Sequence, residues 1–302
     1  MSGDSITYKA GAASVCITPD EPLWLAGYAV RKSPASGKVS NLYVSALALE
    51  DGAGQRFVIA SIEIISVNAK LAARIFEVVR TKHGLARAQL LLTATHTHYA
   101  PEYRADKQLF FHIPDEYAAK FSAVEDRLVA ATTRAVDEAI DRLEPVRLFA
   151  RETKVGFAHN RRRHGVKAGT PSTEDVLDHD VSLLDCVDAT GRRKAIVFGY
   201  ACHCTTIPPE DLRYCGDWAG FAKEQLEREN PGAIALFLPG AGADQDPEPR
   251  ASLELSQQYG RDLATAVQGS IGGSGVEITR RISIGWDEVE LPLMEVTREK
   301  IE

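Results

Sequence analysis

A strand–helix–strand pattern between residues 56 and 98 constrains the fold of this chain more than any other feature. Residues 56–66 and 90–95 are runs of apolar and β-branched side chains, typical of buried strands. Between them, Asn68 is a suitable cap for a helix that continues to about Lys82, and Gly84 is a suitable stop. Because such a connection is right-handed and places its two strands in parallel, the pattern predicts an α/β fold.

The rest of the chain continues the alternation of strands and helices. Residues 9–49 indicate short strands and turns. The later predicted elements are a helix over 115–143, a strand over 146–151, a hairpin of strands 181–187 and 194–201, a helix that begins just after Asp217 and runs to about 230, a strand over 233–238, a helix over 252–268 and a strand over 276–291. We predict one α/β domain over residues 1–302, with a mixed, largely βαβ-built sheet flanked by helices. Residues 296–302 resemble the first turn of a capped helix, from which we expect a missing C-terminal segment.

Composition and charge exclude several classes of protein. The chain has 302 residues, of which 44% are hydrophobic, so it can bury a substantial core. No apolar stretch reaches the roughly 20 residues that a membrane-spanning helix needs, and we expect neither such a helix nor an export signal. The five cysteines are an odd number and favour free thiols in the reducing cytoplasm. A net charge of -7 argues against a nucleic-acid partner.

Two apolar runs are followed by histidine, which predicts a site at one edge of the sheet. Residues 90–95 lead to His96 and His98, and residues 195–201 lead to His203. If the first strand continued, its alternation would place His96 and His98 on one face. A single histidine at a strand end is usually structural. Because two matching strand ends carry one, and because neutral imidazole is a usual zinc ligand, we predict a metal or proton-transfer site with His96 and His203 as ligands.

Carboxylates accompany the histidines in two other loops. Asp217 stands at a predicted helix start, where it could serve either as an N-cap or in the chemistry. Asp244 and Asp246 lie in the loop 239–247, which lacks the Lys-Ser/Thr pair of a nucleotide-binding loop. Two acids would repel phosphate, so we exclude nucleotide binding there. Beside a metal, they could orient ligands or act as a general base.

Arginine and cysteine side chains complete the set of candidates. Arg161 opens the basic cluster 161–164 and could polarise a carbonyl group, although such a run is usually a solvated loop. Cys202 and Cys204 alternate with His203, so a regular strand would point them away from it. We expect both cysteines to be small buried thiols. The chain has no Gly-x-Ser-x-Gly motif, which argues against serine-hydrolase chemistry.

Seven short motifs, taken in order, resemble those of the neutral/alkaline non-lysosomal ceramidase family. They are VCITP (15–19), LAGY (25–28), ATHTH (94–98), NR (160–161), YACH (200–203), CGDW (215–218) and GADQDP (242–247). The resemblance implies a zinc-dependent hydrolase that cleaves the N-acyl amide bond of a ceramide-like substrate, or an ester bond, with metal-activated water as nucleophile. The expected substrate is thus a small-molecule or lipid-like acyl amide. The sequence does not predict an oligomeric state.

The resemblance also assigns roles to single residues. The zinc ligands fall on His96 and His203. His98, Asp217 and Asp246 are expected to take part in the chemistry, and Arg161, Tyr28 and Asp244 are expected to bind the substrate.

The chain departs from the family pattern in two respects. Asp246 stands where the best-known members have an active-site serine, and the family's remaining zinc ligands, a glutamate and a tyrosine, are expected in the missing C-terminal segment. Two alternatives therefore stay open. One is a non-catalytic binding or scaffold protein, and the other is a two-metal phosphoesterase that uses Asp217, Asp244 and Asp246.

Overall fold

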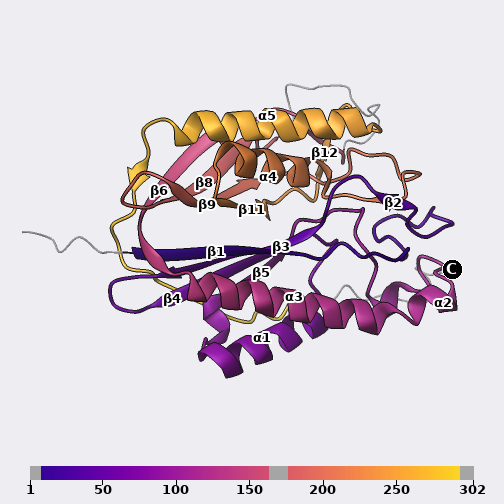
Figure 1. Ribbon diagram of the computed structural model, residues 1–302. Helices are drawn as coiled ribbons and strands as arrows, with labels where there is room; N and C mark the ends of the chain where they lie inside the picture. Colours follow the sequence, from indigo (N-terminus) through magenta and orange to yellow (C-terminus); the bar gives the residue numbers. More distant parts are fainter. Residues whose placement is uncertain (1–7, 163–175, 293–302) are drawn as a thin grey trace, which may run out of the picture.

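A nine-stranded mixed sheet folds into two halves that pack face to face, with helices covering both outer sides (Figure 1). The computed structural model describes residues 8–162 and 176–292. The strands are β1 (Tyr8–Cys16), β2 (Gly37–Lys38), β3 (Tyr43–Glu50), β4 (Arg56–Ile62), β5 (Leu90–Ala94), β6 (Glu144–Lys154), β7 (Ala158–Asn160), β8 (Asp180–Val187), β9 (Arg193–Tyr200), β10 (Arg213–Tyr214), β11 (Ile234–Pro239), β12 (Gln245–Pro247) and β13 (Val276–Glu277). The helices are α1 (Ala69–His83), α2 (Asp115–Ala118), α3 (Phe121–Asp141), α4 (Asp217–Glu229) and α5 (Leu253–Ile271), with short 3-10 turns η1 (Arg87–Gln89) and η2 (Ala105–Lys107).

The strand order confirms the predicted mixed α/β architecture. It runs β11-β9-β8-β6-β1-β3-β4-β5, and β13 also pairs with β6. The two outer pairs, β4 with β5 and β9 with β11, are parallel, and the strands between them pair antiparallel. Each parallel pair is joined by a helix, α1 or α4. The βαβ units therefore lie at the two edges of the sheet.

Packing between the half-sheets brings the two parallel edges together. Side chains such as Leu47 and Ile59 from one half contact Val197 and Leu236 from the other in one buried cluster. Across the same interface, the Ser61 hydroxyl donates to the backbone carbonyl of Phe237 at 2.6 Å. Helices α1 and α3 cover the outer face of the first half, and α4 and α5 cover that of the second (Figure 1). Consequently, the loops that follow β5 and β9 can meet.

The local signals around α1 are confirmed in detail. The Asn68 side chain accepts a hydrogen bond from the backbone N–H of Leu71 at 2.8 Å, which satisfies one free donor of the first turn. Gly84 ends the helix with a φ of 66°, a left-handed conformation that glycine adopts without steric cost. These two residues fix the length of α1 and thus the entry into β5.

Three predicted elements were wrong in length or continuity. Strands β1 and β3 are long and regular, where residues 9–49 indicated short strands, because their alanines fit tightly beneath α3. The helix predicted over 115–143 is two helices, α2 and α3. The strand predicted over 276–291 ends at Glu277, since the chain then crosses the open side of the sandwich, where Ile282 donates its N–H to the Asp51 carboxylate at 3.1 Å. The predicted helix start at 296–302 lies outside the described residues.

Within the described ranges, no helix combines the length and apolar character needed to cross a bilayer.

Candidate metal centre

The loops after β5 and β9 meet through a parallel bridge between Thr97 and Cys204, and this bridge gathers three histidines. The ring centroids lie 5.2 Å apart for His96 and His98, 4.8 Å for His96 and His203, and 6.2 Å for His98 and His203. One nitrogen from each ring lies within 4.8 Å of the other two. Among the described residues, these histidines form the group of three metal-binding side chains whose ligand atoms are close enough to share one ion.

Strand alternation is the wrong reason for this convergence. Strand β5 ends at Ala94, and His96 has a φ of 66°, in the left-handed region that non-glycine residues rarely adopt. A turn, rather than a continued strand, therefore brings His96 toward His98. Such backbone strain occurs where the surrounding structure holds a residue for a specific purpose.

Two of the rings are oriented by backbone carbonyl groups. The Nδ1 atom of His96 lies 2.7 Å from the carbonyl oxygen of Ile65, and that of His203 lies 2.7 Å from the carbonyl oxygen of Gly242. Because a carbonyl oxygen can only accept, each Nδ1 carries the proton. Each Nε2 is then the unprotonated nitrogen, the tautomer that a metal ligand requires, and that of His203 accepts a hydrogen bond from Arg161 at 3.2 Å.

Burial disfavours the charged form of the three imidazoles. Desolvation lowers the pKa of His96, His98 and His203, and it lowers that of His98 farthest. Each nearby ring and the Arg161 guanidinium lower the pKa of His98 further. Both ring nitrogens of His98 are buried without a hydrogen-bond partner among the described residues. Neutral imidazole is the form of histidine that binds zinc.

Arg161 and Asp246 adjoin this cluster. The Arg161 Nη2 atom lies 3.2 Å from His203 Nε2, and its Nη1 atom donates to the Asp246 carboxylate at 3.2 Å. The other oxygen of Asp246 accepts from Arg250 at 2.8 Å. Asp246 is only 3% exposed, so it is a buried carboxylate held between two guanidinium groups. Arg250 was not singled out from the sequence, although its i,i+4 spacing from Asp246 was a signal.

Asp217 has a different environment from the one predicted. It is fully buried, and helix α4 begins at this residue rather than after it, so the N-cap reading is wrong. Its carboxylate accepts hydrogen bonds from the Thr206 N–H at 2.9 Å, the Trp218 N–H at 2.7 Å and the Ser256 hydroxyl at 2.6 Å. Burial nevertheless raises the pKa of Asp217. These bonds tie the loop after His203 to α4 and α5.

The remaining predicted residues lie at the margin of the cluster. The Tyr28 ring packs on His98 with 4.7 Å between centroids, and burial raises the pKa of Tyr28 to about 12. The side chain of Asp244 is half-buried, and its carbonyl accepts from the Arg161 N–H at 2.8 Å. Cys202 and Cys204 are buried free thiols, as expected, and burial raises the pKa of each well above its usual range.

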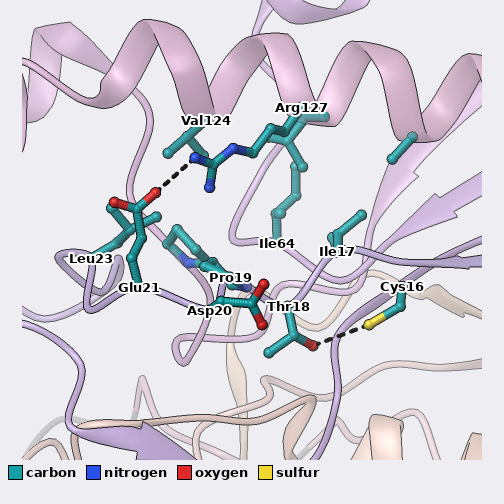
Figure 2. Close-up of a pocket in the computed structure, with 13 residues that line it drawn as sticks. Cys16, Ile17, Thr18, Pro19, Asp20, Glu21, Leu23, Ile64, Val124 and Arg127 are labelled. Carbon is teal, nitrogen blue, oxygen red and sulfur yellow. Dashed lines mark hydrogen bonds and ion pairs between the residues drawn. The ribbon is translucent and has the colours of Figure 1, made fainter.

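A separate cavity of about 450 Å³ opens between the end of β1 and helix α3 (Figure 2). Its walls are mostly apolar, and the ion pair between Arg127 and Glu21, 2.7 Å long, lies at one side. None of the predicted site residues lines it. It does share Ile64 with the site, because the carbonyl of Ile64 accepts from the His96 N–H at 3.1 Å.

Comparison with known proteins now identifies the family. The model of the neutral/alkaline non-lysosomal ceramidase family, N-terminal part, matches residues 8–240. The chain belongs to this family. Among curated members, it is 22% identical over 245 residues to the neutral ceramidase of Pseudomonas aeruginosa and 25% identical over 252 residues to that of Drosophila pseudoobscura pseudoobscura. These alignments cover 78% and 79% of the chain, and 36% and 34% of the relatives. The chain thus spans about a third of the length of these ceramidases.

Solved ceramidase structures share the fold. The crystal structure of the Pseudomonas aeruginosa neutral ceramidase superposes with a TM-score of 0.79 at 20% sequence identity, over 92% of this chain and 47% of that one. A ceramidase described as complexed with C2 gives a TM-score of 0.78, also at 20% identity, over 91% of this chain and 45% of that one. The layered sandwich described above is therefore the ceramidase N-terminal fold.

Proposed function

We propose that this chain carries the zinc-binding part of a hydrolase that cleaves the N-acyl amide bond of a ceramide-like substrate, or a related ester. The observation that carries the proposal is the convergence of His96, His98 and His203, whose nitrogens lie within 4.8 Å of one another. Membership of the ceramidase family supports the choice of an amide. In this proposal, His96 and His203 hold the ion through Nε2, because their Nδ1 atoms are already engaged with carbonyl groups.

A bound zinc ion supplies Lewis acidity, which activates water and polarises a carbonyl group. The side chains around it supply the rest of the chemistry. His98 has unpaired ring nitrogens, so its ring N–H can donate to the oxygen of the scissile carbonyl. The Arg161 side chain is 31% exposed and can donate to the oxygen of the scissile carbonyl. Tyr28 packs on His98 and would exclude water from one side of it.

The three aspartates take different parts in this proposal. Asp246 holds Arg161 in place through its carboxylate, and Asp217 holds the loop that carries His203. Asp244 is half-buried at the margin, where it can contact a polar part of the substrate. The carboxylates of Asp217 and Asp246 are occupied by donors, which disfavours the two-metal phosphoesterase alternative.

The first experiment is the zinc content of the purified chain, compared with that of His96→Ala and His203→Ala. We expect about one zinc per chain, lost in both variants, followed by zinc-dependent release of fatty acid from an N-acyl amide. Binding of zinc without turnover on a panel of acyl amides and esters would instead favour the binding or scaffold alternative. Absence of zinc from the wild-type chain, even after zinc is added, would refute the proposed site.

A further inference from the structure

His98 is held differently from its two neighbours. The rings of His96 and His203 are each fixed by a hydrogen bond from Nδ1 to a carbonyl group, at 2.7 Å in both cases. The ring of His98 has no hydrogen-bond partner among the described residues. Its direction must therefore be set by its own backbone and by the atoms packed around it.

Arg31 binds the backbone of His98 directly. Its side chain is almost completely buried, with 3% exposed, and Nη1 donates both to the His98 carbonyl at 2.7 Å and to the Ala26 carbonyl. Its Nε atom donates to the Pro209 carbonyl at 3.2 Å. One guanidinium group thus joins three loops that surround the site. Burial lowers the pKa of Arg31 to about 10, so the group stays charged at neutral pH.

The same guanidinium holds the residues that cover the His98 ring. It lies over the rings of both Tyr28 and Tyr99, 4.8 and 5.0 Å from their centroids. Tyr28 in turn packs on His98. Beside it, Gly27 has a φ of 97°, and a Cβ atom there would lie 2.4 Å from His98 Nδ1. The turn of residues 26–28 therefore packs closely against the His98 ring.

We propose that Arg31 is a positioning residue that fixes the direction of the His98 imidazole, by binding the backbone carbonyls of Ala26 and His98 and by packing on the rings of Tyr28 and Tyr99. The inference rests on the proposed function, because it concerns a side chain of the proposed catalytic site. Arg31 lies outside all the motifs that relate this chain to the ceramidases. Its role follows from the contrast between the anchored rings of His96 and His203 and the unanchored ring of His98.

The test is Arg31→Lys, which keeps the positive charge but loses the planar fork that reaches several carbonyls at once. We expect kcat to fall on the order of 10- to 100-fold, the effect of misplacing a catalytic group by about 1 Å. KM and zinc content should change little, since the rings of His96 and His203 are held by other carbonyls.

Arg151→Lys is the matched control. Arg151 is also buried, with 8% of its side chain exposed, and it donates to the carbonyls of Ser270 and Gly273 and lies over the Phe149 ring. It holds the end of α5, away from the histidines. We expect this variant to lose thermal stability comparable to that lost by Arg31→Lys but to keep the wild-type kcat. Equal kcat losses in the two variants, or loss of zinc from Arg31→Lys, would overturn the proposal.

A second measurement separates this proposal from the proposed function. If the wild-type chain shows no turnover, the proposed function fails, and Arg31 is tested by the Cε1–H NMR signal of His98, assigned from its loss in His98→Gln. That signal should move in Arg31→Lys and stay in place in Arg151→Lys. An unmoved His98 signal in Arg31→Lys would refute the positioning role, whatever the reaction is.

Discussion

At the scale of single residues, Asp246 of β12 is a buried carboxylate, 3% exposed, beside the histidine cluster. An anion in this place is stable because two guanidinium groups bind it, one from Arg161 and one from Arg250. The Asp246 carboxylate is therefore an anchor for the Arg161 side chain.

This reading predicts the effect of removing the charge. Asp246→Asn should lower the free energy of unfolding by about 1–3 kcal/mol, because charged hydrogen bonds to a buried acceptor are lost while both arginines are partly exposed and can find water. Urea unfolding measures the change. Asp244→Asn is the control, since its carboxylate is half-buried on the same loop, and it should stay within about 0.5 kcal/mol of wild type. Equal losses in the two variants would contradict the anchor role.

At the scale of elements, helix α1 sets where β5 begins and therefore where the histidine loop starts. Its N-cap bond from Leu71 to Asn68 is a local interaction that any packing change elsewhere leaves intact. Asn68→Ala should cost about 1 kcal/mol of stability, whereas Asn68→Ser, which retains a capping oxygen, should cost much less. Urea midpoints of the two variants measure the difference. If both variants lost the same stability, the capping bond would not be the cause.

The sequence predicted a strand or helix most reliably where a short-range signal determines that element. The apolar runs of β4, β5, β9 and β11, and the cap and stop of α1, needed no knowledge of distant residues. It was least informative where packing decides. The alanine-rich strands β1 and β3 are weak strand formers that are stabilised by α3, and the segment after Glu277 leaves its strand because the sandwich ends there.

In the candidate site, too, local sequence signals predicted some features, and packing determined the others. Histidine after an apolar run predicted the ligands His96 and His203. The left-handed backbone at His96 and Asp217, with φ of 66° and 53°, could not be foreseen, because only the surrounding fold holds these residues there. Arg31 was missed for a related reason. A lone arginine in a loop is usually exposed, and its burial depends on three loops that are distant in sequence.

At the scale of the whole molecule, one buried ion pair joins the two halves of the sandwich. Lys223 of α4 contacts the Glu63 carboxylate at the end of β4, and the two residues are 3% and 1% exposed. Lys223→Met should destabilise the fold by about 3–5 kcal/mol, because it leaves a buried carboxylate without its partner. The double variant Lys223→Met/Glu63→Gln should recover part of that loss. Chemical denaturation of both variants measures this, and no recovery would indicate that lost packing, rather than the unpaired charge, is the cause.

The histidine cluster also makes the stability of the metal-free molecule depend on pH. Burial lowers the pKa of His96, His98 and His203 below the value of 6.5 that they have when exposed. As the pH falls through 6.5, the unfolded chain therefore binds protons that the folded chain does not, and stability decreases. Carboxyl groups whose pKa is raised by burial, such as Asp217, oppose this trend at lower pH. The histidine effect should thus dominate between pH 7.5 and about 5.5.

Urea unfolding of chelator-treated protein at these two pH values tests the sign. Wild type should be less stable at the lower pH, and His98→Gln should lose less stability over the same interval, because it removes the histidine whose pKa is lowered farthest. The exposed His112 provides the control, since His112→Gln should keep the wild-type pH dependence. A wild-type stability that stays constant, or an unchanged loss in His98→Gln, would mean that the cluster admits protons freely in the folded state. That result would also remove the argument that its imidazoles are neutral and ready to bind a metal.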